Sequence, residues 1–360
     1  MKGWRECKLS DAVKFGNGKV RPNSDGTIPV YGGNGILGFG NESNYKDETI
    51  VIGRVGAYCG AVYFENKPIW VSDNALSAKP TDISDAKFIF YYLKNLGLNQ
   101  FAEGSSHPLV TQTLLNSIDI IIPSTLPEQK AIAAVLSSLD DKIDLLHRQN
   151  KTLEAMAETL FRQWFVEEAD EGWEEVPLSF YADNIRENVK VENLSDHEHY
   201  VGLEHIPRKR VILDSWGATD SIESNKSTFK KYDILFGKLR SYFHKVVYTP
   251  ISGVCSTDIL VIRAKKEHWQ PFCLFWFFSK DVVEHSDLGS GGTRMPRTNW
   301  EIVSSYKVPC PPEELIIEFD RIIRPSLNKM FQNINAIRTL EKIRDTLLPK
   351  LMSGEVRVKV

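Results

Sequence analysis

The chain has 360 residues, of which 42% are hydrophobic and 25% charged, and its formal net charge at pH 7 is -3. This length and composition predict a soluble protein with two globular units, each able to bury its own core. The slightly acidic balance excludes a generic polyanion binder, because such a protein binds through an excess of basic residues. Any contact with nucleic acid must therefore come from local basic patches.

Targeting and metal-binding signals are missing from the sequence. The longest apolar run, Phe272 to Phe278, is far shorter than the roughly 20 residues that a membrane span needs. The five cysteines are scattered and form no C-x-x-C pair, and His197, His199 and His205 have neither a nearby cysteine nor a helical i, i+4 spacing. We therefore expect a cytoplasmic protein that holds no metal and no cofactor of its own.

Residues 1–122 are predicted to form a first globular unit of short strands, turns and a little helix, an α/β (α+β) fold. The stretch from Asn17 to Asn44 is rich in turn-forming residues, whereas Thr49 to Ile52 and Ala61 to Phe64 are strand candidates. A short helix is expected from Ala86 to Leu96.

A glycine-rich stretch, Gly33-Asn34-Gly35-Ile36-Leu37-Gly38, has the letters of the G-x-G-x-x-G nucleotide-binding fingerprint. That motif needs a strand before it and a helix after it, and no helical run follows here. We interpret the stretch as a flexible turn that lines a contact surface, where glycine allows a close approach of the backbone.

Residues 123–171 are predicted to form one long helix. Thr125 and Glu128 have the spacing of a capping box, and Pro127 suits the first turn. Apolar residues then recur at alternating steps of three and four, and Asn150 is the single polar residue of this seam, interpreted as a device that fixes the register. Such a seam requires a helical partner.

The N-terminal segment of the chain is repeated later in the sequence. Gly3-Trp4-Arg5-Glu6 with Leu9 matches Gly172-Trp173-Glu174-Glu175 with Leu178, and further matches follow in order, such as Gly53 with Gly237 and Leu153 with Leu340. The chain is therefore predicted to be an internal repeat whose second globular unit covers residues 172–308.

A basic stretch marks the second unit. Residues 226–245 carry six lysines and arginines against Asp233 alone, interleaved with aromatic residues. This composition suits a track along a phosphate backbone, although a solvated pair of strands is the more common meaning of such a run. Arg208-Lys209-Arg210 adds a second basic cluster.

A glycine-rich loop from Gly289 to Arg297 contains Arg294 and Arg297 and no acidic residue, so it could reach base edges or phosphates. Its counterpart in the first copy, Gly104 to Gln112, has His107-Pro108 and a weaker electrostatic case for DNA. Different chemistry at one place in the repeat fits readers of two different sequences, and it equally fits ordinary loop drift.

Residues 309–360 are predicted to form a second long helix and a C-terminal tail, with a kink at Pro325. Residues 123–171 hold five basic against ten acidic side chains, whereas residues 309–360 hold nine against seven, so opposite charge favours pairing of the two helices. We expect an antiparallel, coiled-coil-like spacer; the alternative is that each helix packs on its own unit. The residues expected to pair the helices are Leu136, Leu139, Ile143, Leu146, Asn150, Leu153, Leu160, Ile334, Ile337, Leu340 and Leu347.

An internal two-fold repeat presents two similar surfaces in opposed orientations, an arrangement that matches two half-sites on duplex DNA. We therefore interpret the chain as a reader of a bipartite DNA sequence. Local charge and loop position nominate as DNA contacts Arg21, Asn34, Arg54, Tyr58, His107, Arg208, Lys209, Arg210, Lys238, Arg240, Tyr242, Arg294 and Arg297.

These features resemble the specificity subunit of type I restriction-modification systems. Pro123 with Leu126-Pro127-Glu128-Gln129 is similar to that family's entry into its central helix, and residues 343–356 are similar to its distal helix. The resemblance covers the full length. It implies target-recognition domains at 1–122 and 172–308, a central helical spacer at 123–171, and a distal helical spacer with a C-terminal tail at 309–360.

The resemblance also implies a non-catalytic role. Each recognition domain would read one half of a split site in double-stranded DNA, and the helices would dock two methyltransferase subunits, which restriction subunits then join. S-adenosylmethionine would be bound by the methyltransferase, and ATP and Mg by the restriction subunits.

Two other functions stay open from the sequence. An enzyme with unrecognised methyltransferase or nuclease motifs would itself bind S-adenosylmethionine. A protein-interaction scaffold would lack salt-sensitive, sequence-selective binding to DNA.

Overall fold

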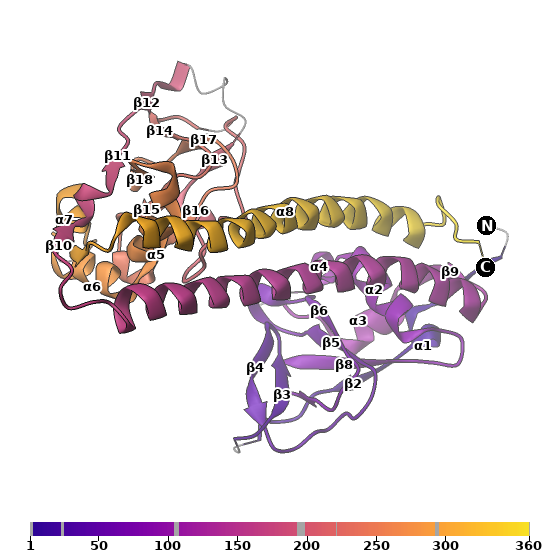
Figure 1. Ribbon diagram of the computed structural model, residues 1–360. Coiled ribbons are helices and arrows are strands. Elements are labelled where there is room, and N and C mark those ends of the chain that lie inside the picture. The colour runs from indigo at the N-terminus through magenta and orange to yellow at the C-terminus, as the bar shows by residue number, and fades with distance from the viewer. Residues whose placement is uncertain are drawn as a thin grey trace. The chain divides into compact units, whose positions relative to one another are not determined.

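The computed structural model describes residues 3–22, 25–103, 108–192, 199–220, 222–291 and 295–359. The chain divides into two compact units: unit 1 consists of Met1–Asp144 and Arg338–Val360, and unit 2 of Leu145–Ile337. Two long helices, α4 (Leu126–Arg162) and α8 (Glu313–Met352), therefore contribute one segment to each unit (Figure 1). The predicted domain boundaries follow the sequence repeat rather than these contacts, and they remain a prediction.

Unit 1 contains two small sheets and a separate strand pair. The first sheet is antiparallel with strand order β2-β8-β5-β6, the second has the order β4-β3-β7 with β3 and β7 parallel, and β1 pairs with β9. The strands are β1 (Trp4–Lys8), β2 (Val13–Asn17), β3 (Ile28–Gly32), β4 (Gly35–Gly40), β5 (Thr49–Gly53), β6 (Val62–Glu65), β7 (Trp70–Val71), β8 (Ala75–Pro80) and β9 (Asp119–Pro123). The helices are α1 (Leu9–Ala12), α2 (Ala86–Leu96) and α3 (Gln112–Ser117).

The strongest local signals of unit 1 are confirmed. All five residues of β5 are buried, as expected of a β-branched run in the middle of a sheet. The side chain of Asp85 caps α2 by accepting a hydrogen bond from the Phe88 N–H, and Gly97, in the left-handed conformation, ends the helix. The predicted strands near 49–52 and 61–64 and the predicted helix 86–96 therefore form.

Unit 2 repeats this arrangement. Its sheets have the strand orders β11-β18-β15-β16 and β12-β14-β17-β13, with β13 and β17 parallel, and β10 pairs with β19. The strands are β10 (Glu175–Pro177), β11 (Ala182–Asn184), β12 (Asn188–Val189), β13 (Tyr200–Val201), β14 (Lys226–Phe229), β15 (Ile234–Gly237), β16 (Val246–Tyr248), β17 (Gly253–Cys255), β18 (Ile259–Ala264) and β19 (Lys307–Pro309). The helices are α5 (Gln270–Phe278), α6 (Lys280–Leu288) and α7 (Trp300–Ser304).

The internal repeat is confirmed by the order of equivalent elements. Strands β2, β5, β6 and β8 of unit 1 occupy the same sheet positions as β11, β15, β16 and β18 of unit 2. In each unit, the sheet made of these strands is followed along the chain by a buried helix, α2 or α5, and later by a strand that pairs with the start of the repeat. Two mixed units of strands and helices in tandem, each followed by a long helix, agree with the predicted fold class.

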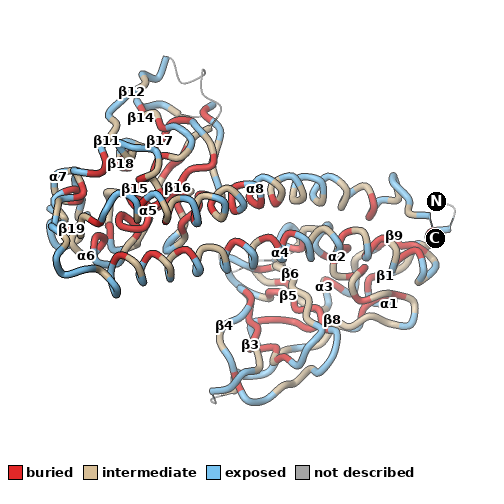
Figure 2. The backbone as a smooth tube through the Cα atoms, in the orientation of Figure 1, coloured by how far each residue is buried: buried red, intermediate tan, exposed pale blue. Residues whose placement is uncertain are grey.

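The two long helices lie antiparallel within each unit. In unit 2, Asn150 meets Asn333 while Phe165, further along the chain, meets Phe319 at a ring-centroid distance of 5.1 Å. In unit 1, the Arg344 guanidinium lies 2.8 Å from the Asp140 carboxylate. Figure 2 shows buried and exposed residues alternating along α4 and α8, as expected of amphipathic helices.

Helix α4 ends at Arg162, before residue 171, to which the long helix was predicted to extend, and continues as a π-helical turn, η3 (Gln163–Glu167). At its start, the carboxylate of Glu128 accepts hydrogen bonds from Arg357 of the C-terminal tail, at 2.7–2.9 Å. Helix α8 remains helical through Pro325, which is exposed. A kink at Pro325 remains a prediction.

The residues expected to pair the helices all face away from solvent at least in part. Leu136 belongs to the core of unit 1, against which Leu347 also packs, so the helices contact both each other and the globular part of their unit. In unit 1, α4 therefore packs on the globular part that precedes it in the chain, as the alternative expects, whereas the end of α8 packs on that same globular part and not on the one that α8 follows. Buried are Leu136, Ile143, Leu146, Asn150, Ile334 and Ile337, and half-buried are Leu139, Leu153, Leu160, Leu340 and Leu347.

Candidate nucleic-acid interface

Two equivalent turns stand out when the units are compared. Turn A, residues 53–60, connects β5 to β6, and turn B, residues 237–244, connects β15 to β16. Each contains a 3-10 turn, η1 (Gly56–Tyr58) or η7 (Ser241–Phe243). An equivalent backbone hydrogen bond of 2.8 Å closes each turn, from the Gly53 N–H to the Ala61 carbonyl and from the Gly237 N–H to the Lys245 carbonyl.

A basic residue begins each turn in the same backbone setting. The Arg54 N–H donates to the Asn74 carbonyl at 3.1 Å, and the Lys238 N–H donates to the Asp258 carbonyl at 2.8 Å. The carbonyls of the two basic residues accept from the N–H groups of Val110 and Thr298, at 3.0 and 3.1 Å. Arg54 and Lys238 are therefore structural equivalents.

An exposed tyrosine follows four residues later in each turn. The side chains of Tyr58 and Tyr242 are 53% and 49% exposed. An exposed aromatic ring beside a cation is a combination that suits contact with nucleic acid. Arg54 adds a further feature, because its Nε is buried and has no hydrogen-bond partner.

A second segment crosses each turn. In unit 2, Leu239 bridges to Arg297, which also bridges to Gly291; in unit 1, Val55 bridges to Leu109, which also bridges to Glu103. Arg297 of unit 2 therefore corresponds to Leu109 of unit 1. The guanidinium of Arg297 lies 3.3 Å from the Asp258 carboxylate. Of the loop residues nominated from the sequence, His107 and Arg294 lie outside the described residues.

The cluster of Arg208, Lys209 and Arg210 divides between two neighbours. The Arg208 guanidinium lies 3.8 Å from the centroid of the Phe243 ring, and the Lys209 N–H donates to the His244 carbonyl at 3.0 Å. Arg208 and Lys209 therefore join turn B. Arg210 instead pairs with Asp214 at 3.2 Å.

The hairpin between β3 and β4 brings Asn34 next to turn A. A Cβ atom added at Gly53 would lie 2.6 Å from the Gly33 carbonyl oxygen, so the two backbones can approach closely because Gly53 has no side chain. Asn34 is exposed beside Gly33, while Arg21 lies against Gly38 at the middle of β4. The glycine-rich stretch is thus a hairpin turn with no helix after it.

The continuous basic track predicted over residues 226–245 is wrong at its start. Lys226 is 6% exposed, and its ammonium group donates to the Ser224 carbonyl at 2.9 Å. Phe229 and Phe236 are core residues. The number of basic residues in the sequence overstated the exposed positive charge, because alternate residues of a strand point inward.

Two further basic groups near turn B are unsuited to phosphate contact. Burial lowers the pKa of His244, with a smaller contribution from the charge of Lys209, so its imidazole is neutral at pH 7. Burial also lowers the pKa of Lys245, whose ammonium group donates to the Leu203 carbonyl. The cations of the candidate interface are therefore Arg21 beside β4 and Arg54 in turn A, with Arg208, Lys209, Lys238, Arg240 and Arg297 around turn B.

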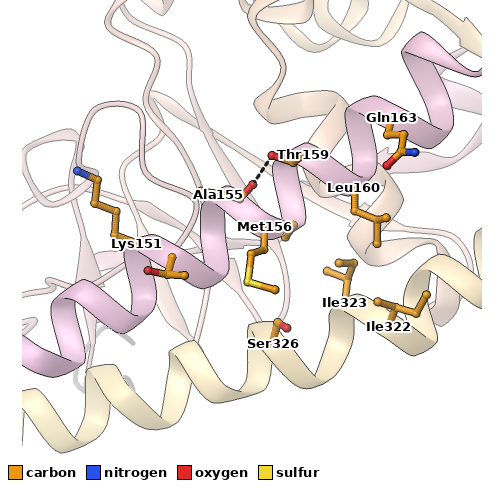
Figure 3. Close-up of a pocket in the computed structure, with 11 residues that line it drawn as sticks. Lys151, Ala155, Met156, Thr159, Leu160, Gln163, Ile322, Ile323 and Ser326 are labelled. Atoms are coloured by element: carbon orange, nitrogen blue, oxygen red, sulfur yellow. Dashed lines mark hydrogen bonds between the residues drawn. The ribbon is translucent and has the colours of Figure 1, made fainter.

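A groove of about 640 Å³ lies between α4 and α8 in unit 2. Figure 3 shows Met156 and Leu160 pointing from α4 toward Ile323 and Ser326 of α8. Met156 is 63% exposed and Ile322 40% exposed, although both are apolar. In unit 1, Ile343 of α8 occupies the position in the repeat that corresponds to Met156, and it is 42% exposed.

Among the described ranges, no cluster of three or more His, Cys, Asp or Glu side chains could hold a metal ion. None of the helices in that part of the chain has the length and apolarity to cross a membrane. The fold repeats one unit twice, and each copy has a turn with a basic and an aromatic residue. These features define a class of protein with two similar candidate binding surfaces and a pair of long helices.

The family model described as type I restriction modification DNA specificity domain matches residues 1–155 and 196–343. Because these matches cover most of the sequence, the chain belongs to this family.

Two curated proteins to which the chain is similar are specificity subunits of type I restriction enzymes. The specificity subunit of the type I restriction enzyme MjaIX from Methanocaldococcus jannaschii is 26% identical over 332 residues, which cover 83% of this chain and 76% of the relative. The EcoprrI specificity subunit from Escherichia coli is 31% identical over 112 residues, 31% of this chain and 28% of the relative. The crystal structure of the type I restriction-modification S subunit from M. genitalium has the same fold, with a TM-score of 0.69 and 19% identity, over 97% of this chain and 96% of that chain.

Proposed function

We propose that this chain is the specificity subunit of a type I restriction-modification system. It reads a bipartite DNA sequence and docks two methyltransferase subunits, and through them restriction subunits, for adenine methylation or restriction. The observation that carries the proposal is the equivalence of turns A and B, which place Arg54 and Lys238, and Tyr58 and Tyr242, at matching positions of two similar units.

Two similar reading surfaces suit a split site in double-stranded DNA. A chain of net charge -3 has no general attraction for DNA, so the affinity must come from local cations. We assign Lys238, Arg208 and Lys209 to phosphate contacts and Arg240 and Arg297 to base edges, because arginine forms the bidentate contacts that discriminate bases. In unit 1, the proposed contacts are Arg21, Asn34, Arg54, Tyr58 and His107.

The groove between the helices is the proposed docking surface for the methyltransferase. Met156 and Ile343 are exposed apolar side chains at equivalent positions of the two helices, so one matching surface is available in each unit. An apolar helix face of the partner would cover them. Two equivalent surfaces support a stoichiometry of two methyltransferase subunits for each chain.

The chemistry belongs to the partners in this proposal. The methyltransferase binds S-adenosylmethionine and takes the target adenine out of the base stack, as enzymes that modify bases must. ATP and Mg are used by the restriction subunits. This chain contributes sequence selection and the spacing of the two half-sites.

Binding selection tests the proposal. The full chain, in complex with the methyltransferase subunit of its own system, is used to enrich sequences from a random duplex DNA library at low and moderate salt. We expect a split motif with a fixed gap and an affinity that falls as salt rises. Enrichment of no sequence, or affinity without salt dependence, would leave a protein-interaction scaffold as the better account. S-adenosylmethionine binding by the chain alone would instead indicate an enzyme.

A further inference from the structure

Turns A and B follow the same backbone path with different residues. The φ angles of Gly56 and Gly60 in turn A are +78° and +84°, and the equivalent residues of turn B, Arg240 and His244, have φ angles of +51° and +52°. Residues other than glycine rarely adopt this left-handed region, and they are strained there. At these two positions, turn B therefore carries side chains, whereas turn A carries none.

Packing explains one of these two positions. A Cβ atom added at Gly60 would lie 2.4 Å from the backbone nitrogen of Asn99, so unit 1 needs glycine there. In unit 2, the His244 ring packs against Phe278 at a centroid distance of 4.6 Å. His244 thus has a packing role in its own unit.

The position of Arg240 has no such explanation. A Cβ atom added at the equivalent Gly56 would meet nothing within 4 Å, so the space beside turn A does not require glycine there. The Arg240 backbone is fixed by a 2.9 Å hydrogen bond from its N–H to the Pro296 carbonyl and another from the Phe243 N–H to its own carbonyl. Its guanidinium forms no hydrogen bond or ion pair with any residue in the part of the chain that the structure describes.

Other strained residues of unit 2 help to interpret Arg240. Tyr232, with a φ of +78°, is stacked on Tyr248 and Phe331 at ring-centroid distances of 5.8 Å, so packing holds its backbone. Lys209, with a φ of +52°, is tied to turn B through its hydrogen bond to His244. Arg240 is therefore the residue of turn B whose strained backbone conformation packing does not explain, and strain of this kind is typical of functional sites.

Resting on the proposed function, we propose that Arg240 specifies the half-site of unit 2 by reading a guanine in the major groove. Arginine donates two N–H groups to O6 and N7 of guanine, which is the commonest specific contact between a side chain and a base. Arg297 is already paired with Asp258, whereas Arg240 is unpaired among the described residues. Turn A has Gly56 at the equivalent position, so its half-site lacks this reader.

Three chains are compared in the test. Arg240→Gly gives turn B the backbone residue that turn A uses, and it relieves strain. Lys231→Ala is the matched control, because Lys231 is an exposed cation outside turn B. Each full chain, in complex with the methyltransferase subunit, selects from a random duplex DNA library, and its thermal midpoint is measured.

We expect Arg240→Gly to keep or raise the thermal midpoint and to lose the preference for one G·C pair in one half-site, by about tenfold to a hundredfold. The other half-site and the Lys231→Ala motif should match the wild type. An unchanged motif for Arg240→Gly overturns the proposal. Equal weakening on all sequences with a smaller salt dependence also overturns it, because that result marks a phosphate contact.

A second variant covers the case in which the glycine variant fails to fold. Arg240→Asn removes the guanidinium and keeps a residue that tolerates the left-handed region, so the same loss of one G·C preference is expected. If the wild-type complex selects no split motif, the proposed function fails. If it selects one that Arg240 variants leave intact, only the present inference fails.

Discussion

Glu154 on α4 shows how a single side chain can make the stability of unit 2 depend on pH. Its pKa is raised to about 7, mainly by burial; a hydrogen bond from the Val211 backbone opposes this shift, and the charge of the neighbouring Glu158 adds to it. Because the folded pKa lies above the unfolded value, the folded state keeps a proton that the unfolded chain loses first. The stabilisation is present below about pH 4.5 and is lost as pH rises through about 7.

Glu154→Gln removes the free-energy cost of burying the ionised carboxylate above about pH 7. We expect the variant to unfold with a free energy about 1–2 kcal/mol higher than the wild type at pH 8, after allowance for the partial exposure of the site. Its stability should also vary less between pH 4.5 and 7. Urea unfolding at several pH values measures both, with Asp141→Asn, an exposed carboxylate on the same helix, as the control. Parallel profiles for Glu154→Gln and wild type would contradict the assignment.

At the scale of elements, a buried amide pair joins α4 to α8 within unit 2. The Asn333 side-chain NH₂ donates to Asn150 at 2.8 Å and to Gln149 at 2.9 Å, and the Asn150 NH₂ donates to the Met330 carbonyl at 3.3 Å. Asn150 and Asn333 are 3% and 1% exposed. Polar residues at such seams commonly fix the register of paired helices at some cost in stability.

Replacing one asparagine removes the side-chain hydrogen-bond partner of the other. We expect Asn150→Leu to lower the free energy of unfolding by about 1–3 kcal/mol, because Asn333 would then keep buried polar atoms with fewer partners. The double variant Asn150→Leu/Asn333→Leu should be less destabilised than the sum of the two single variants. A double-mutant cycle by urea unfolding measures this coupling. Additive effects would mean that the pair does not act as a unit.

The docking surfaces give a second prediction for the helices. Met156→Asp should remove one of two bound methyltransferase subunits, Ile343→Asp the other, and the double variant both, since a buried unpaired carboxylate disfavours an apolar contact. Native mass spectrometry of the purified complex measures the stoichiometry. Leu145→Asp is the control, an exposed apolar residue of α4 outside the groove. Two subunits retained by the double variant would rule out this surface.

The sequence predicted elements best where the pattern is periodic or locally dense. The seam of α4, the strand β5 and the helix α2 follow from the spacing of apolar residues, and the repeat follows from ordered matches such as Gly53 with Gly237. The equivalence of turns A and B was missed, although glycine, a basic residue and, four residues on, tyrosine recur in both. The pairing of Glu128 with Arg357 joins residues too far apart in sequence for any local pattern to show.

At the scale of the whole molecule, we propose that the number of helical residues sets the gap between the half-sites. Seven residues inserted into both helices, after Thr152 and after Gln332, keep the apolar seam in phase and add about 10 Å of helix. At about 3.4 Å per base pair, the gap should grow by roughly three base pairs. Library selection should return the same half-sites at the wider spacing. An unchanged gap in a complex that still assembles would disprove the ruler.

The most direct test of the central claim is a genome-wide map of methyladenine in cells that express the methyltransferase subunit with and without this chain. We predict a split motif with a fixed non-specific gap that is methylated only when this chain is present. A stable complex that methylates no such motif, or a motif that persists without this chain, would contradict the assignment of DNA specificity to this protein.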